Sequence, residues 1–331
     1  MTVKSTYLGA AAVLALVAGA AAADPAVIYD LGGKFDKSFN ESSYNGAQRW
    51  ADETGNAFAE VELQSDAQRE QAIRRFADEG YNPIIMAGFM NATPLAAIAP
   101  EYPDTTFVII DAVVDAANVR SVVFNEHEGS YLVGMLAAMA SETGTVGFVG
   151  GMDIPLIRKF GCGYAQGVLA ANPDATVIAN FTGTTPAAWN DPVKGSELTL
   201  AQISQGADVV YAAAGATGVG VLQTAADQGI YSIGVDANQN YMHPGSVLTS
   251  MLKRVDNAVY DAMLAGPEVE TGVQVMGIAN GGVGYSLDEF NAELITPEMQ
   301  AAVDAAAAEI TAGTLAVHDY STDETCPAIT F

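Results

Sequence analysis

Short runs of β-branched and aliphatic residues alternate with longer stretches of helical periodicity along almost the whole chain. This alternation is typical of βαβ units around a parallel sheet, because parallel strands need a crossover connection that is usually a helix. Strands are expected at residues 25–30, 83–87, 106–111, 121–124, 145–149, 175–181 and 208–212, and helices at 38–54, 66–80, 130–141, 155–171, 192–205 and 296–313. The chain is therefore predicted to be an α/β protein.

The two halves of the chain repeat one pattern. Residues 84–88 form a strand and a glycine turn and lead through a helical stretch to a strand that ends at Asp111, while residues 210–215 lead in the same way to Asp236. Open parallel sheets bind ligands at the carboxyl ends of their strands, so two facing domains would bring both aspartates to one cleft. With 331 residues, the chain also exceeds the roughly 250 to 300 residues at which single cores usually divide. We therefore expect two similar domains.

The first residues have the pattern of a secretory signal peptide. Lys4 precedes an apolar run at residues 8–20, and small residues at 21–23 come before Asp24. The run is too short and too rich in alanine for a good membrane anchor, which needs about 20 strongly apolar residues. Because no cysteine lies near the junction, we expect residues 1–23 to be removed and the protein to diffuse freely in a periplasm, not as a lipoprotein.

The net charge of −26 excludes several partners. A chain this acidic repels nucleic-acid phosphates and anionic lipids unless a local basic patch reverses the field, and its few basic residues are scattered. Cys162 and Cys326 are the cysteines of the chain. In an oxidising compartment they are a candidate disulfide; two unrelated buried thiols are the alternative, because sequence does not give their separation.

Motifs for several kinds of enzyme are missing. The three histidines lack metal-ligand spacing, and there is no GxSxG motif for a nucleophilic serine. The glycine-rich turn at 215–220 follows a strand but matches neither the dinucleotide fingerprint nor the P-loop. Residues 30–36 carry two separated aspartates and no adjacent Asp pair, which leaves only weak support for a calcium-dependent nucleoside hydrolase. We expect no cofactor, no metal and no catalysis.

Several segments resemble the basic membrane protein family, the purine nucleoside-binding lipoproteins of ABC importers. The segment 30–40, DLGGKFDKSFN, carries the resemblance most clearly, and FNEHEGSYLVG at 124–134, VGGMDIP at 149–155, GVD at 234–236 and SMLK at 250–253 follow in family order. The resemblance spans nearly the whole mature chain. It implies a type I periplasmic binding protein fold, with two Rossmann-like lobes joined by crossing strands.

The resemblance also implies roles for individual residues. Phe39 would stack on a purine base and Asn40 would bind its edge, together with Asp30 and Asp111. Trp189, where the family more often has Phe, would stack on the other face of the base. Asp236 and Lys253 would hold the ribose hydroxyls. The remaining residues expected to line the cleft lie in the turns after two strands: Gly88, Phe89 and Gly215.

Each of these residues also has an ordinary structural explanation. Phe39 could staple the start of a helix and Asn40 could be a plain first-turn residue. Asp111 and Asp236 could cap the turns that follow their strands, and Lys253 could be a surface charge.

The family pattern implies one lobe from residues 24–128 and 252–290 and another from 129–251 and 291–331. We expect a monomer that carries guanosine, inosine or adenosine to an ABC permease of the inner membrane. A binding protein for a free purine base or riboflavin is the nearest alternative, and a nucleoside hydrolase is the alternative from another class.

Overall fold

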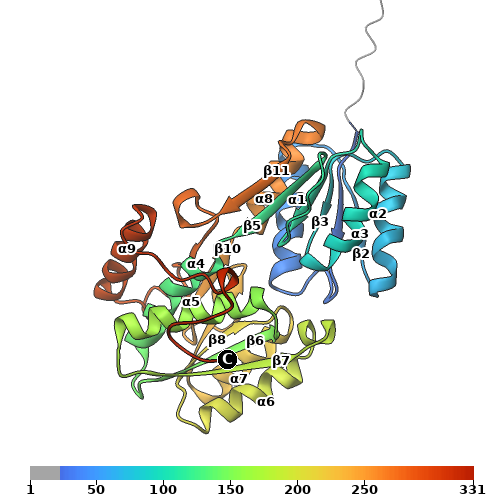
Figure 1. Ribbon diagram of the computed structural model, residues 1–331. Coiled ribbons are helices and arrows are strands. Elements are labelled where there is room, and N and C mark those ends of the chain that lie inside the picture. Colours follow the sequence, from blue (N-terminus) through green and yellow to red (C-terminus); the bar gives the residue numbers. More distant parts are fainter. Residues whose placement is uncertain (1–22) are drawn as a thin grey trace, which may run out of the picture.

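The computed structural model describes residues 23–331, so the predicted signal peptide lies outside the described residues except for its last residue. Figure 1 shows two α/β lobes, one above the other. Within residues 23–331 each lobe is built on one six-stranded sheet. The predicted fold class is confirmed.

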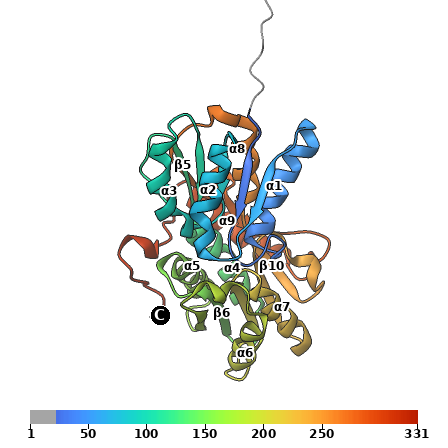
Figure 2. The same ribbon diagram turned by 90° about the vertical axis from the view of Figure 1, so that its right-hand side faces the viewer.

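The first lobe has a fully parallel sheet with the strand order β11-β5-β4-β3-β1-β2. Its strands are β1 (Ala26–Tyr29), β2 (Ala59–Glu62), β3 (Ile84–Met86), β4 (Phe107–Ile110), β5 (Val119–Phe124) and β11 (Gly272–Met276). Its helices are α1 (Phe39–Thr54), α2 (Arg69–Asp78), α3 (Ala92–Ile98) and α8 (Val255–Ala265). Figure 2 shows α1 and α8 on one side of this sheet, with α2 and α3 on the other. The central strands are apolar throughout because helices cover both faces.

The second lobe has the order β12-β10-β9-β8-β6-β7, with β12 antiparallel to β10. Its strands are β6 (Thr145–Met152), β7 (Thr176–Gly183), β8 (Val209–Ala213), β9 (Tyr231–Asp236), β10 (Val247–Lys253) and β12 (Val283–Tyr285). Its helices are α4 (Glu126–Ala140), α5 (Pro155–Ala171), α6 (Pro192–Ile203), α7 (Thr217–Gln228) and α9 (Pro297–Thr311).

The described chain passes between the lobes at three places: after β5, after β10 and after β11. β12 lies within the range 252–290 that sequence assigns to the first lobe, but it pairs in the second sheet. The third crossing therefore lies between Met276 and Val283. The exact lobe boundaries remain a prediction.

Helix α4 begins at Glu126, four residues before the position expected from its apolar pattern. Two polar residues, Glu126 and His127, make the start of the helix hard to see in the apolar pattern, because both are buried at the crossing. Helices α4 and α5 then pack backbone to backbone, since side chains at Gly134, Gly163 or Gly167 would overlap the opposite helix. This close approach fixes the middle of the molecule, beside the crossing strands.

Ser38 and Glu41 have the sequence spacing of a capping box, which predicts that the Ser38 hydroxyl caps α1, but this box does not form. The Asp36 carboxylate instead accepts the N–H groups of Ser38, Asn40 and Glu41 at 2.8–3.1 Å, so it satisfies the free donors at the start of α1. The Ser38 hydroxyl makes no capping hydrogen bond.

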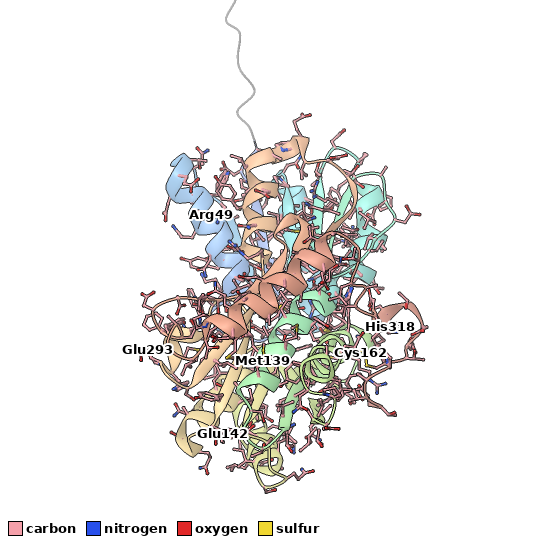
Figure 3. All side chains as sticks on the ribbon, turned by 90° about the vertical axis from the view of Figure 1, so that its left-hand side faces the viewer. Arg49, Met139, Glu142, Cys162, Glu293 and His318 are labelled. Atoms are coloured by element: carbon pink, nitrogen blue, oxygen red, sulfur yellow. A yellow bond between two sulfur atoms is a disulfide. The ribbon has the colours of Figure 1, made fainter. Side chains whose placement is uncertain are left out.

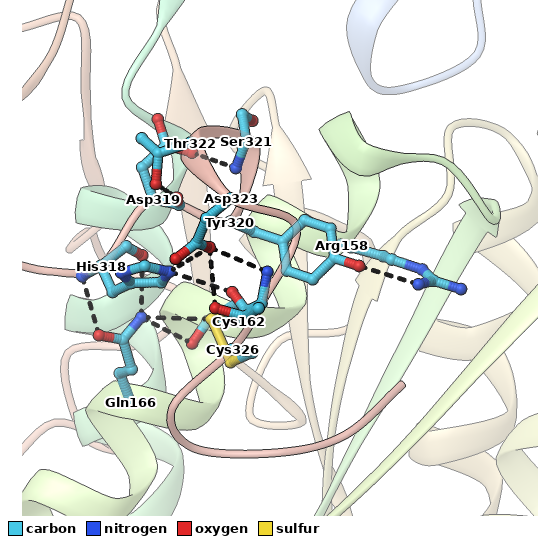
Figure 4. The surroundings of a disulfide bond; sticks show 11 residues. Arg158, Cys162, Gln166, His318, Asp319, Tyr320, Ser321, Thr322, Asp323 and Cys326 are labelled. Atoms are coloured by element: carbon cyan, nitrogen blue, oxygen red, sulfur yellow. Dashed lines mark hydrogen bonds and ion pairs between the residues drawn. A yellow bond between two sulfur atoms is a disulfide. The ribbon is translucent and has the colours of Figure 1, made fainter.

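After α9 the chain runs along α5 to Phe331, a segment we call the strap (residues 312–331). A disulfide joins Cys162 of α5 to Cys326 of the strap, with a Cα–Cα distance of 5.6 Å. Figure 3 shows Cys162 and His318 near one another on this side of the molecule. Figure 4 shows Gln166 bonded to the backbone of His318, and Arg158 donating to the Tyr320 hydroxyl.

None of the helices in residues 23–331 combines the length and apolarity that a bilayer-spanning helix requires.

Candidate ligand-binding cleft

A cavity lies between the lobes, where strands of both sheets end. It encloses about 600 Å³ of empty space, part of it open to solvent. Every residue predicted to contact a ligand lines it: Asp30, Phe39, Asn40, Gly88, Phe89, Asp111, Trp189, Gly215, Asp236 and Lys253. The remaining lining residues are Leu31, Asp36, Ile157, Phe160, Ala213, Ala214 and Val235. The fold thus brings together residues from distant parts of the chain.

A buried lysine lies between two carboxylates at this cavity. The Nζ atom of Lys253 is 2.7 Å from Asp111 Oδ2 and 2.9 Å from Glu126 Oε1. Burial lowers the pKa of Lys253, but the attraction of the two carboxylates outweighs it and leaves the pKa raised. Lys253 is therefore a permanent cation, not a surface charge. Aromatic rings lie 5.0–5.4 Å from its Nζ: Phe39, Phe124 and Phe160.

Asp111 has one carboxylate oxygen without a partner. Its Oδ2 atom accepts from Lys253, whereas Oδ1 is buried and has no hydrogen-bond partner among residues 23–331. Burial raises the pKa of Asp111 against the opposing effect of Lys253. An unpaired buried acceptor is costly, so a ligand that brings an N–H or O–H donor would relieve that cost.

The charge pairing continues from the cavity to the strap. Lys159 of α5 lies 3.1 Å from Glu126 Oε2 and 3.3 Å from Asp319 Oδ2. Its ammonium also donates to the Phe124 carbonyl at 2.7 Å. The strap thus contributes a carboxylate to a chain of charges that ends at the cavity.

Asp30 is held by an arginine that the sequence analysis missed. Arg69 Nη2 lies 2.5 Å from Asp30 Oδ1, and the arginine is almost fully buried. Asn40 bonds to the same loop: its Oδ1 accepts the Asp30 N–H at 3.0 Å, and its Nδ2 donates to the carbonyls of Asp30 and Gly33. These bonds occupy both donors of the Asn40 amide and leave one lone pair of Oδ1 for a ligand.

Two further carboxylates have pKa values raised by burial. The pKa of Asp236 and that of Asp36 each rise to about 6. Asp236 ends β9 and accepts from the Ser38 hydroxyl of the other lobe at 2.5 Å. Both side chains are buried. Together with Asp30 and Asp111 they make the lining of the cavity acidic.

The two predicted stacking residues come from different lobes. Phe39 begins α1, while Trp189 ends a short 3₁₀ turn (Pro186–Trp189) after β7. The Trp189 ring lies directly against Gly151 of β6, where a side chain would overlap it. Gly32 of the first lobe approaches Trp189 as well, since a Cβ there would be 3.9 Å from Trp189 Cβ. The lobes are therefore closed around the cavity.

Sequence reasoning missed the residues that support the cavity from behind. Arg69, Glu126 and Lys159 make ion pairs through tertiary contacts with Asp30, Lys253 and the strap. A weak signal existed for Glu126, which follows a buried strand inside the motif at 124–134. Arg69 and Lys159 stand on helices where a basic residue is ordinary.

Two facing α/β lobes with an acidic, aromatic cavity between them define the class of two-lobed solute-binding proteins. The family model described as "ABC transporter substrate-binding protein PnrA-like" matches residues 24–311. The chain therefore belongs to this family, named Bmp, as the motifs predicted.

Similar proteins agree with this assignment. The nucleoside-binding protein BmpA of an ABC transporter in Lactococcus lactis is 30% identical over 316 residues, covering 86% of this chain and 88% of its own. A lipoprotein of Pyrococcus furiosus is 35% identical, covering 78% and 69%. The crystal structure of an ABC transporter solute-binding protein from Aeropyrum pernix has a TM-score of 0.82 at 30% identity, covering 91% of this chain and 95% of its own.

These relatives overturn one prediction. Three relatives from Pyrococcus species are named lipoproteins, a class anchored to a membrane by lipid. The expectation of a freely diffusing periplasmic protein that is not a lipoprotein is therefore wrong by this comparison. It depended on residues 1–23, which lie outside the described residues except for Ala23.

Proposed function

We propose that this protein captures a purine nucleoside in the cleft and delivers it to the permease of an ABC importer. The observation that carries the proposal is the pairing, in one closed cavity, of an aromatic residue from each lobe with several buried carboxylates. The name of the Lactococcus lactis relative, a nucleoside-binding protein, supports it.

The base would lie between Phe39 and Trp189. A purine has two apolar faces, and stacking on an aromatic side chain contributes roughly 1 to 3 kcal/mol per base. The edge of the base carries N–H donors, which would meet Asp30 and the remaining acceptor of Asn40.

The ribose would lie among Asp236, Asp111 and Lys253, so we assign Asp111 to the ribose and not to the edge of the base, where the family resemblance places it. Its hydroxyls are donors that a buried carboxylate needs, and Asp111 Oδ1 has no other partner among residues 23–331. Lys253 Nζ has three donors. Asp111 Oδ2 accepts one, and Glu126 Oε1 forms an ion pair with the ammonium at 2.9 Å, so at least one donor is left for a ribose oxygen. The acidic lining also disfavours ligands with a phosphate group.

Because the aromatic residues belong to different lobes, a ligand would complete its contacts only when the lobes close. Binding and closure would then be one event, which lets a permease distinguish loaded from empty protein. We propose a monomer without catalytic activity. A sizing column coupled to light scattering tests the oligomeric state.

A thermal-shift screen tests the ligand class. We expect guanosine, inosine or adenosine to raise the melting temperature more than the free bases or riboflavin, since a ligand at one hundred times its Kd adds about 2.7 kcal/mol to stability. A larger shift with bases or riboflavin would contradict nucleoside recognition. Each nucleoside is also incubated with the protein and analysed by chromatography, and we expect no free base. Release of free base would indicate a nucleoside hydrolase instead.

A further inference from the structure

The loop before α1 reaches across the cleft and bonds to the second lobe. The Ser38 hydroxyl donates to Asp236 Oδ2 at 2.5 Å, and Gln239 Nε2 donates to the Lys37 carbonyl at 2.9 Å. Lys37 and Ser38 belong to the first lobe, whereas Asp236 and Gln239 follow one another closely at the end of β9. These two bonds therefore exist only when the lobes are closed.

The Ser38–Asp236 bond is buried, and the Gln239–Lys37 bond is partly buried. Ser38 is 0% exposed and Gln239 is 1% exposed. Hydrogen bonds to an ionised group are stronger than neutral ones, and exclusion of water strengthens them further. Separation of the lobes would therefore break one buried hydrogen bond to a carboxylate and one partly buried hydrogen bond to a backbone carbonyl.

The local structure leaves Ser38 free for this contact. Asp36 caps α1 through backbone N–H groups, so the helix does not use the Ser38 hydroxyl. Gln239 is fixed on its own side, because its Oε1 accepts the Val235 N–H at 2.9 Å and its N–H donates to Ser250 Oγ. Each partner is thus held by hydrogen bonds within its own lobe.

We propose that Ser38 and Gln239 form a latch that holds the lobes closed. Ser38 donates to the carboxylate of Asp236, which also lines the cavity. Ser38 is a positioning residue: it orients Asp236 and stabilises the closed form, even in protein without ligand. This inference goes beyond the proposed function and does not depend on the identity of the ligand.

The test measures the distance between the lobes directly. Spin labels are placed on Glu79→Cys after α2 and Glu197→Cys in α6, both exposed and on different lobes. The native cysteines are paired and do not react. Pulsed electron spin resonance then compares the protein, dialysed free of small molecules, with Ser38→Ala, the rescue variant Ser38→Thr, and Ser43→Ala.

Ser43→Ala is the matched control. Ser43 is also fully buried near the start of α1, but its hydroxyl donates only to the Phe39 carbonyl within the helix. We expect Ser38→Ala to shift the distance distribution towards the open form, by about tenfold in the ratio of open to closed protein. Ser43→Ala and Ser38→Thr should keep the distribution of the unaltered protein. Identical distributions for Ser38→Ala and Ser43→Ala would overturn the latch.

Stopped-flow binding gives a second readout once a ligand is known. Because closed lobes must open before a ligand can leave, Ser38→Ala should raise the dissociation rate about tenfold. An unchanged dissociation rate would also overturn the proposal. If no nucleoside binds, the proposed function fails, but the distance measurement still decides on the latch.

Discussion

Asp111 and Asp236 occupy matching positions in the two lobes, each at the carboxyl end of a central strand and each with left-handed backbone, at φ values of 71° and 64°. A positive φ is uncommon for residues other than glycine, and such conformations gather at functional sites. In both lobes this backbone places a carboxylate at the cavity. The repeated pattern in the sequence thus corresponds to two aspartates, one from each lobe, that line the same cavity.

The first prediction concerns Asp236 and pH. Its pKa rises to about 6 in the folded protein, from an ordinary value of 3.8. The folded state therefore binds this proton more tightly than the unfolded state, so stability falls as pH rises from about 4 to about 6 and is level above. Asp236→Asn imitates the protonated form and should raise the free energy of unfolding by about 2 kcal/mol at pH 7.5.

Urea denaturation at pH 4.5 and 7.5 checks this. The variant should have a smaller difference between the two pH values than the unaltered protein, and it should lose ligand affinity. Asp227→Asn, at an exposed position in α7, is the control. Equal pH dependence of stability in the unaltered protein, Asp236→Asn and Asp227→Asn would show that burial does not raise the pKa of Asp236.

The second prediction concerns Lys253. Lys253→Met would leave Asp111 and Glu126 buried without their shared cation. Removing one partner of a buried ion pair costs about 3 to 5 kcal/mol, so we expect a loss of this size in urea denaturation. Adding Asp111→Asn should restore part of it. Lys194→Met breaks an exposed pair with Glu197 and should change stability by less than about 1 kcal/mol. Similar losses in the two lysine variants would argue against the buried network.

The third prediction concerns the strap. The disulfide closes a loop across 164 residues, and constraint of the unfolded chain by so long a loop stabilises the fold by about 5 kcal/mol in the chain-entropy model. Cys162→Ser with Cys326→Ser should lower the melting temperature as much as dithiothreitol does in the unaltered protein. Dithiothreitol should have no effect on the variant. A reductant effect that persists there would mean that another reaction is being measured.

The fourth prediction concerns Trp189. Gly151→Ala places a methyl group where the indole ring now lies, which forces the ring towards the cavity. We expect at least a tenfold loss of nucleoside affinity in calorimetry, because an aromatic stack contributes about 1 to 3 kcal/mol. Gly183→Ala is the control, since its new Cβ would lie 3.5 Å from Ala188 Cβ, an ordinary contact. Equal nucleoside affinity in Gly151→Ala and Gly183→Ala would show that Trp189 does not contact the ligand.

Much of the fold was predictable from sequence because the central strands are buried on both faces. β4 and β8 read as continuous apolar runs, and their helices carry clear apolar faces. The edge strands β2, β11 and β12 lack such runs: β2 alternates with glutamates, and most of β11 is exposed. Their pairing is decided by tertiary contacts that local patterns do not record.

The cavity was predictable where a motif fixes the local backbone, as at Asp30, Phe39 and the two strand-end aspartates. Its supporting charges were not, because Arg69 and Lys159 find their partners only after folding. The Ser38 side chain shows the same limit. Its sequence position suggested a helix cap, whereas folding gives that task to Asp36 and turns the hydroxyl towards the other lobe.

Titration calorimetry of the purified protein with inosine and with 2′,3′-dideoxyinosine tests the central claim most directly. The account predicts one inosine bound per chain and at least hundredfold weaker binding of the dideoxy compound, because the buried carboxylates of Asp111 and Asp236 would then lose their hydroxyl donors. Equal affinity for the two compounds, or no heat with inosine, guanosine or adenosine, would contradict recognition of a nucleoside in this cleft.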